Sequence, residues 1–374
     1  MIPPRAAGES RYLPIDAMRG IAALSVLFFH LQDDSPQTAV LKRVLPGPWK
    51  LASDYGRSGV AIFFVISGFV IAYTTRDLGS RVRDGVRFSI RRQVRLDPPY
   101  YLVIAGVVIV FSSERFVPGL VYQHYTPREV VLNMFYLQGI AKVPSILGVA
   151  WTLCLEVQFY LFVTLLVIAS GWFVRDAAAR SRRRRRRRLV RIGASVMAGF
   201  SLSLPFLGWS AGPWFVGLWW MFWFGMVLCW FAIGQVSQAT VLATTCGLAV
   251  WCVAMQAAGH ADRWGGEWTA LLSGLAILAL LMTGRMSSRP PRALLFFGAI
   301  SYSLYLIHGP VIDTLMAAGF KLTGSNRFGA VLFYLLGAGV SVGSAVLLRR
   351  FVERPSMRLS HRLKSARLRS LARH

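Results

Sequence analysis

The chain has 374 residues, of which 55% are hydrophobic and only 16% are charged, and its mean hydropathy is +0.50. This composition is too apolar for a water-soluble surface. The charge is nonetheless extreme, because 42 basic and 16 acidic side chains leave a net charge of +26. Few charges with so large an imbalance indicate short basic blocks between long apolar runs, as in a polytopic membrane protein. Nucleic-acid binding is disfavoured, because the arginine blocks flank these runs and do not form one basic face with interleaved aromatic residues.

Ten apolar runs are each about long enough to cross a hydrocarbon core of roughly 30 Å as a helix. A further apolar piece at 130–140 is too short to span, and we expect it to lie in the interface or to re-enter the bundle. No cleavable signal peptide is expected, because the first run follows a polar lead and contains Asp16 and Arg19. The predicted transmembrane helices lie at residues 16–32, 57–75, 99–113, 150–173, 190–208, 213–232, 236–258, 267–283, 294–317 and 328–348.

The basic residues set the predicted orientation. With the N-terminus in the cytoplasm, most of the 42 basic residues fall in cytoplasmic segments, as the positive-inside rule requires. An odd number of spans would remove this asymmetry. We therefore expect an all-α integral membrane protein with both termini in the cytoplasm. It forms a single domain over residues 1–374, with its core at about 12–356 and a basic cytoplasmic tail at 357–374.

The seven consecutive arginines at 182–188 form the densest of the basic blocks. We interpret this run as a cytoplasmic anchor beside anionic lipid headgroups; a funnel for an anionic cytoplasmic ligand is the alternative. The four cysteines lie inside apolar runs without metal-ligand spacing, so neither a disulfide nor a metal site is expected.

The first predicted span carries ionisable residues on one face. Arg19 and His30 are eleven residues apart, so they differ by only about 20° around a helix and by about 16 Å along it. Charged groups in a span are unfavourable and are therefore functional candidates. Arg19, at the cytoplasmic end, is suited to hold phosphate, and His30 is suited to move a proton. Asp16, one turn before Arg19, can pair with it. The alternative is a snorkelling arginine and a hydrogen-bonded histidine.

A second basic pair follows the second span. If this loop is helical, Arg92 and Arg95 are neighbours on one face, just before Pro98 and Pro99 break the helix. The pair is suited to clamp a phosphorylated ligand, and it is equally compatible with a positive-inside anchor.

Polar residues also interrupt three later spans. In the second span, Ser67 and Gly68 permit close helix approach. Glu156 is a carboxylate inside the fourth span, with Tyr160 one turn later on the same side. A carboxylate there is neutralised or paired. The ninth span carries a polar stripe that predicts a cavity wall more than a lipid-facing surface. Its members are Ser301, Tyr305 and His308, and the possible partners of Glu156 are Arg19, Arg57 and His30.

Taken in order, these motifs resemble the acyltransferase 3 family of bacterial integral membrane proteins, which O-acylate surface polysaccharides, lipid-linked sugars, Nod factors or macrolides. The resemblance extends from about residue 12 to residue 356. In one departure, relatives often have two consecutive acids where this chain has Glu156 and Val157. The motifs are Asp16-x-x-Arg19-Gly20 with His30, Phe63 to Phe69, Arg92-x-x-Arg95, Trp151 to Tyr160, Ser301 to His308, and Phe351 to Pro355.

The resemblance implies a cytoplasmic acyl-CoA donor, by default acetyl-CoA, and a carbohydrate hydroxyl as acceptor, either extracytoplasmic or lipid-linked. Arg19, Arg92 and Arg95 would hold the CoA phosphates, and His30 would be the general base. A transient acyl-imidazole on His30 is left open. The expected catalytic group is Asp16, His30 and Glu156, with Glu156 orienting His30 or the acceptor. The expected cavity residues are Ser67, Tyr160, Ser301, Tyr305 and His308, of which the last two donate hydrogen bonds to the oxyanion.

We therefore expect a multi-pass O-acyltransferase of the bacterial cytoplasmic (inner) membrane. Its expected partners are acyl-CoA, a carbohydrate or other hydroxyl acceptor and membrane lipids, without metal or nucleic acid. The alternative is a transporter or flippase that moves an anionic or glycan substrate through the same polar path without acyl transfer. The lack of paired helices broken by Gly or Pro counts against it. A non-enzymatic partner in polysaccharide synthesis is a weaker third reading. The sequence leaves the acceptor and the oligomeric state open.

Overall fold

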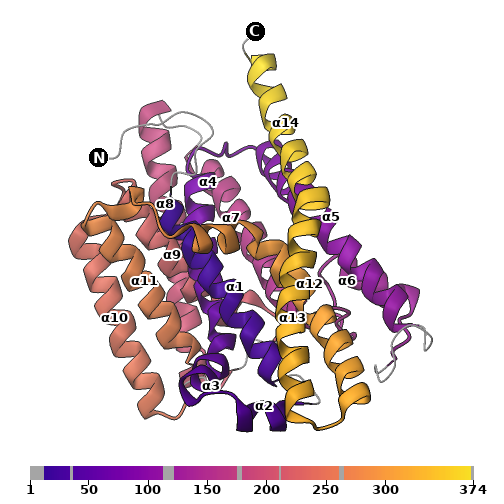
Figure 1. Cartoon of the computed structure of the whole chain (residues 1–374). Coiled ribbons are helices and arrows are strands. Elements are labelled where there is room, and N and C mark those ends of the chain that lie inside the picture. Colours follow the sequence, from indigo (N-terminus) through magenta and orange to yellow (C-terminus); the bar gives the residue numbers. More distant parts are fainter. Residues whose placement is uncertain are drawn as a thin grey trace. The chain divides into compact units, whose positions relative to one another are not determined.

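The computed structural model describes residues 12–33, 37–112, 122–174, 179–209, 212–260 and 265–371. All regular elements in these residues are helical (Figure 1). They are α1 (Leu13–Asp33), α2 (Thr38–Val44), α3 (Gly47–Asp54), α4 (Gly59–Thr75), α5 (Val82–Phe111), α6 (Pro127–Met134), α7 (Trp151–Trp172), α8 (Ala179–Ser203), α9 (Trp219–Ala232), α10 (Gln238–Ala257), α11 (Gly266–Met282), α12 (Arg292–Thr323), α13 (Arg327–Leu348) and α14 (Arg354–Leu371).

The chain divides into two compact units, each assembled from separate stretches of sequence. The boundary between them falls inside α1, α5, α7 and α12, so each of these helices contributes to both units. Within the described residues, the first unit holds the chain up to Arg19, then Ser58–Ser89 and Leu155–Leu295, and the second holds Gly20–Arg57, Ile90–Cys154 and the chain from Phe296 onward.

The protein is a multi-pass membrane protein. In the part of the chain that is described, eight helical stretches are long and apolar enough to cross a membrane. Each overlaps one predicted span, and several extend well beyond it. Two further predicted spans fall on α11, which has only 17 residues, and on α8, which begins with the arginine run. The count of ten and the orientation of the termini therefore stay predictions. The eight stretches are Leu13–Asp33, Gly47–Thr75, Val82–Phe111, Gly148–Trp172, Phe215–Ala232, Gln238–Ala257, Arg292–Thr323 and Arg327–Arg362.

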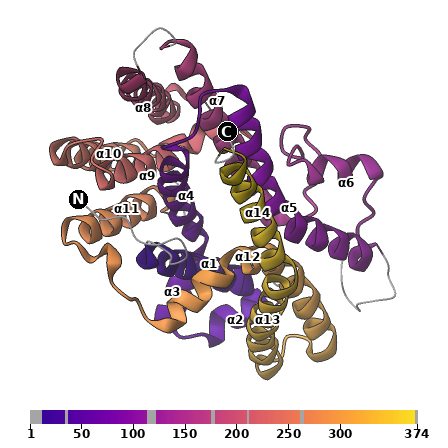
Figure 2. The same cartoon turned by 90° about the horizontal axis from the view of Figure 1, so that it is seen from above.

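The first unit is organised around the contact between α4 and α9, which confirms the close approach predicted at Gly68. A Cβ on Gly68 would lie 1.8 Å from the carbonyl oxygen of Phe222, and one on Gly225 would lie 1.9 Å from that of Val65. Any larger side chain at either glycine would force the two backbones apart. Small residues let membrane helices approach in this way. Helices α10 and α11 run beside each other next to this pair (Figures 1 and 2).

The second unit packs α12 against α13 and against the segment that follows it. The Phe333 ring of α13 lies against Gly319 of α12, where a Cβ would come within 2.3 Å of it. At its end, α13 passes through a π-helical turn at Arg349–Glu353 and continues as α14, the yellow helix of Figure 1. Near the start of the unit, the Trp49 indole donates a hydrogen bond to the hydroxyl of Tyr334 at 2.7 Å.

The expectation that Pro98 and Pro99 break a helix is wrong, because α5 runs through both prolines without interruption. Each proline removes one backbone N–H and the hydrogen bond it would make to the preceding turn. Membrane helices tolerate this loss where other groups satisfy the freed carbonyls. The Tyr302 hydroxyl of α12 donates to the carbonyl oxygen of Leu96 at 2.7 Å, which anchors α5 to α12 beside the prolines but does not replace either lost bond. The apolar run after the prolines then continues the same helix.

The short apolar piece at 130–140 begins within α6. This helix has a complete capping box between Thr126 and Glu129. The buried Asn133 ties it to its surroundings, since its carbonyl accepts from the Tyr100 hydroxyl and its side-chain oxygen accepts from the backbone of Ile146. Whether this piece lies in the interface or re-enters the bundle stays a prediction.

Candidate active site

Two histidines from distant motifs meet in the second unit. His30 lies near the end of α1 and His308 in the middle of α12. Their ring centroids are 5.0 Å apart, with an angle of 51° between the ring planes. His30 is half-buried, and His308 is 1% exposed. The sequence motifs nominate both residues, but only the fold brings the two imidazoles into contact.

The surroundings of His308 determine which nitrogen carries its proton. Its Nδ1 lies 3.0 Å from the carbonyl oxygen of Leu304, one turn earlier in α12. A carbonyl only accepts hydrogen bonds, so this contact requires the proton on Nδ1. In the neutral ring, Nε2 is then the acceptor nitrogen. His308 can therefore take a proton at Nε2, and it can donate from Nε2 only as a cation.

Next to this pair, Tyr305 belongs to a small hydroxyl network. Its hydroxyl lies 2.8 Å from Oγ1 of Thr152 and 3.3 Å from the carbonyl oxygen of Val149, and Thr152 also contacts that carbonyl at 3.0 Å. Two hydroxyl protons are shared among three contacts, so at any moment one of them lacks a proton. The network links α12 to the start of α7. The Tyr305 hydroxyl therefore helps to hold these two helices together within the second unit.

The polar stripe on α12 faces the protein interior. Ser301 is 0% exposed, and Tyr305 and His308 are also buried. On the same helix, Ser303 donates a hydrogen bond to the buried carboxylate of Glu353 at 2.6 Å. Glu353 belongs to the closing motif and lies in the π-helical turn, an element that often occurs at functional sites. This bond ties the helix that carries His308 to the C-terminal part of the unit.

In the first unit, the carboxylate of Glu156 has a hydrogen-bond partner that was not among those the sequence suggested. The Ser67 hydroxyl of α4 donates to Oε1 of Glu156 in α7 at 2.8 Å. Both residues are half-buried, and Tyr160, one turn after Glu156, is buried. The hydrogen bond between Ser67 and Glu156 thus brings together two of the predicted site residues. A role for Glu156 in orienting His30 or the acceptor stays a prediction.

The two basic motifs both lie on helices. Arg19 shares the uninterrupted α1 with His30, about 16 Å apart along its axis. Asp16 and Arg19 are half-buried, and the ion pairs of the described residues, such as that of Lys42 with Asp33, do not include one between these two.

The other basic motif lies in the second unit. Arg92 and Arg95 are half-buried and one turn apart on α5, so they are neighbours on one helix face, as predicted. The carbonyl of Arg91, in the same turn, accepts a hydrogen bond from Ser360 of α14. This part of α5 is therefore held against the basic C-terminal helix.

One carboxylate near the second motif was missed by the sequence motifs. Asp97 lies two residues after Arg95, and its two oxygens accept hydrogen bonds from Tyr136 at 2.9 Å and Tyr101 at 3.3 Å. Tyr136 has a φ of 60°, an uncommon value for a residue with a Cβ. The sequence feature that could have identified Asp97 is an acidic residue beside two prolines at the start of an apolar span.

These elements define a class of protein. In the residues described, the helices that can cross a membrane bury one histidine, hydroxyls and carboxylates, and there is no group of three His, Cys, Asp or Glu side chains that could hold a metal ion. Such interior groups suit proton and group transfer inside a multi-pass membrane protein. Residues 13–350 match the acyltransferase domain family called acyltransferase 3, and the chain belongs to this family.

Three named relatives are similar to the chain. It is 27% identical to nodulation protein 10 of Rhizobium leguminosarum bv. viciae, over 94% of this chain and 95% of the relative. It is 28% identical to the putative peptidoglycan O-acetyltransferase YrhL of Bacillus subtilis, over 46% of this chain and 26% of that protein. It is 29% identical to the acyltransferase MdmB of Streptomyces mycarofaciens, over 43% of this chain and 39% of that protein. No solved structure matches the chain significantly.

Proposed function

We propose that the chain is a membrane O-acyltransferase that moves an acyl group, acetyl in the first instance, from cytoplasmic acyl-CoA to a hydroxyl group of a glycan. The observation that carries the proposal is the contact between His30 and His308 inside a multi-pass member of this family. The name of one relative, the putative peptidoglycan O-acetyltransferase YrhL, supports O-acetyl transfer to a glycan. A CoA nucleotide is confined to the cytoplasm, so the proposed location is the cytoplasmic membrane.

In the proposed reaction, His30 acts as the general base. One imidazole nitrogen takes the proton of the acceptor hydroxyl as its oxygen attacks the thioester carbonyl carbon. The C–S bond breaks, the ester forms, and the CoA thiolate leaves and takes the proton back from the imidazolium as free CoA. His308 is assigned to positioning His30, because its neutral Nε2 accepts hydrogen bonds and its ring already lies against that of His30.

The charged residues of the proposed site hold the donor. Arg19, Arg92 and Arg95 offer planar guanidinium groups, which bind phosphate oxygens through two parallel hydrogen bonds. All three are half-buried, so they keep access to solvent while their stems pack on the protein. Asp16, one turn before Arg19 on the same helix, is proposed to supply a negative charge near its guanidinium group.

The remaining polar residues are proposed to line the cavity in which the acyl donor and the acceptor hydroxyl meet. Glu156, held by Ser67, is proposed to orient the acceptor hydroxyl. The other residues of this proposed lining are Tyr160, Ser301 and Tyr305, whose side chains are buried in the described part of the chain.

The test uses the full chain purified in detergent micelles and acetyl-CoA labelled in the acetyl group. Transfer of label to muropeptides, or to another glycan with free hydroxyls, is measured for the wild type and for His30→Ala. We expect transfer by the wild type and none above background by the variant. Label that stays in acetyl-CoA with every acceptor, together with glycan movement across proteoliposomes that lack the donor, would favour a transporter and overturn the proposal.

A second measurement separates the two routes that the sequence leaves open. The protein is mixed with labelled acetyl-CoA without an acceptor, quenched and digested. Label recovered on a peptide that contains His30 would establish an acyl-imidazole intermediate. Direct transfer predicts no labelled peptide while turnover with an acceptor is intact.

A further inference from the structure

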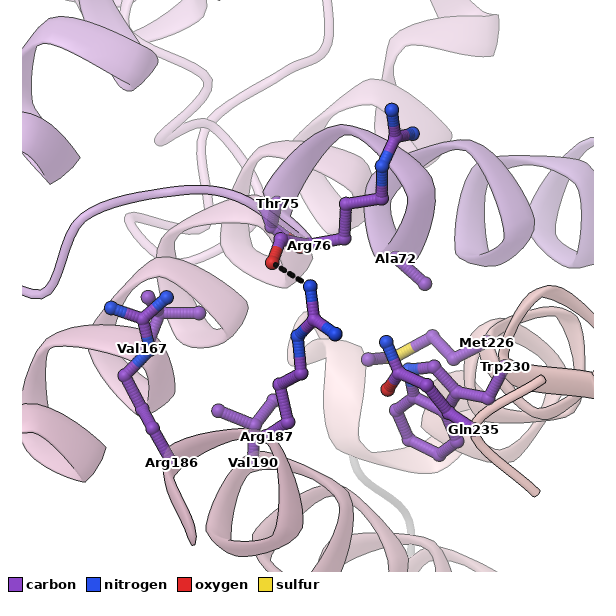
Figure 3. Close-up of a pocket in the computed structure, with 10 residues that line it drawn as sticks. All are labelled: Ala72, Thr75, Arg76, Val167, Arg186, Arg187, Val190, Met226, Trp230 and Gln235. Atoms are coloured by element: carbon purple, nitrogen blue, oxygen red, sulfur yellow. Dashed lines mark hydrogen bonds between the residues drawn. The ribbon is translucent and has the colours of Figure 1, made fainter. Parts of the chain in front are cut away.

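A small cavity lies in the first unit, where α4, α7, α8 and α9 approach one another, and none of its lining residues is assigned to the proposed reaction (Figure 3). Its volume is about 30 Å³, which is room for a group of only a few heavy atoms. One side is apolar and includes Val167, Met226 and Trp230. The other side is polar and is formed by Arg76, Arg186, Arg187 and Gln235.

The cations around this cavity outnumber the acids. Arg76, Arg183 and Arg187 all form ion pairs with the one carboxylate of Asp77. Arg186 lines the cavity beside them, and burial, together with repulsion from Arg183 and Arg187, lowers its pKa from the ordinary value. The half-exposed Asp77, and Asp84, whose charge also acts on Arg186, do not neutralise these four arginines, so the cavity has an excess of positive charge.

Backbone contacts hold two of the arginines in place. Arg187 donates to the carbonyl oxygen of Arg76 at the end of α4, as the dashed line in Figure 3 shows. Arg191 donates to the carbonyl oxygen of Gln235 just after α9 at 3.0 Å. Cations at helix C-termini are favourable. These bonds leave the Nε atom of Arg187 buried, with no hydrogen-bond partner among the described residues.

The depth of the cavity follows from the elements around it. The apolar helices α4 and α9 end at Thr75 and Ala232, beside the cavity, and the arginine run of α8 ends there. The ends of two apolar helices mark the level of the lipid phosphates, and dense arginine marks the cytoplasmic face. A cationic cavity with one apolar wall at this level suits the headgroup of an anionic amphiphile.

We propose that Arg186, Arg187 and Gln235 form a binding site for a phosphate ester group at the cytoplasmic membrane face, beside Arg76, whose guanidinium lies over the Tyr73 ring at 3.7 Å. Guanidinium groups bind such a group in a charge-assisted, bidentate way, and the apolar wall receives the first carbons of the attached chain. The phosphate comes from an anionic phospholipid or from a soluble phosphate compound. The site is separate from the proposed reaction and does not depend on it.

The experiment uses the purified full chain in phosphate-free maltoside micelles. Dioleoylphosphatidylglycerol, dioleoylglycerol or inorganic phosphate is added, and bound molecules are counted by native mass spectrometry. We expect the phosphatidylglycerol to be retained and the phosphate-free dioleoylglycerol not to be. Retention of inorganic phosphate alone would support the phosphate site and assign it to a soluble ligand. Retention of neither phosphate compound would overturn the proposal.

A matched pair of variants tests the location. Arg186→Gln/Arg187→Gln removes two charges that line the cavity, and Arg184→Gln/Arg185→Gln removes two exposed charges of the same run. We expect the first variant to bind the retained compound about tenfold more weakly and the second to bind it as the wild type does. Equal weakening in both would reduce the run to a general anchor and overturn the site. Arg187→Lys keeps the charge and tests the guanidinium fork if the double variant does not fold.

Discussion

The two polar regions of this protein place charge in opposite ways. In the second unit, His30 and His308 meet among hydroxyls and carbonyls, and His308 is almost fully buried. In the first unit, arginines crowd around one half-exposed carboxylate at the ends of apolar helices. A guanidinium stays charged and is unfavourable deep in a membrane, whereas an imidazole can be buried neutral. The histidine pair is therefore suited to proton transfer, and the arginine cluster is suited to holding an anion.

The largest effect should follow the loss of His30. His30→Ala should lower kcat for acyl transfer by about 10²- to 10⁴-fold, because it removes the proposed general base. The measurement is label transfer from acetyl-CoA, with Arg184→Gln as a matched surface control. Partial recovery with added imidazole would support the assignment, and unchanged activity would remove the histidine region from the reaction.

A smaller effect is expected for its partner. His308→Asn should lower kcat by about 10- to 100-fold with little change in KM for acetyl-CoA, since it disturbs the orientation of His30 and not donor binding. The variant keeps a polar side chain in the buried position. Equal losses of kcat in His30→Ala and in the His30→Ala/His308→Asn double variant would show that His308 acts only through His30. A rise in KM alone would contradict the positioning role.

The donor-binding arginines should show the opposite signature. Arg92→Gln should raise KM for acetyl-CoA about tenfold while kcat changes little, because a phosphate contact binds the ground state and the transition state equally. Arg92→Lys keeps the positive charge but lacks the two-pronged guanidinium group, so its KM for acetyl-CoA should lie between those of the wild type and Arg92→Gln. A wild-type KM in Arg92→Gln would return this motif to the role of a cytoplasmic anchor.

The smallest effect is expected at Tyr305. Tyr305→Phe should destabilise the fold by about 1 kcal/mol, because it removes the hydroxyl contacts with Thr152 and Val149. Thermal unfolding in micelles measures this change, and transfer activity should stay within a few-fold of the wild type. Unchanged stability with a loss of kcat beyond tenfold would indicate that the phenol contacts the reacting oxygen instead.

Much of the fold could be predicted because membrane insertion depends on local properties of the chain. The predicted spans 57–75 and 328–348 end at the same residues as α4 and α13. The error at Pro98 has a tertiary cause. A proline pair is a strong local break, but inside a membrane the surrounding helices and the absence of water favour a continuous helix, and α5 is anchored to α12 beside the prolines through Tyr302.

The candidate site was only partly predictable. The residue types were informative, since an ionisable side chain in an apolar span is conspicuous, and all the predicted site residues lie on helices. The hydrogen-bond partners of these residues could not be predicted, because each contact joins segments far apart in sequence. Ser67 with Glu156 and Ser303 with Glu353 are two such contacts.

By itself, the sequence determined that this is a helical membrane protein with a strong basic asymmetry, since hydropathy and charge act on each segment separately. It also carried the family motifs. The tertiary structure alone decided that two imidazoles touch and that three arginines share one carboxylate beside a cavity. Side-chain contacts between helices depend on how each helix is rotated about its axis and on which small residues let it approach its neighbour, and neither is encoded in any single segment.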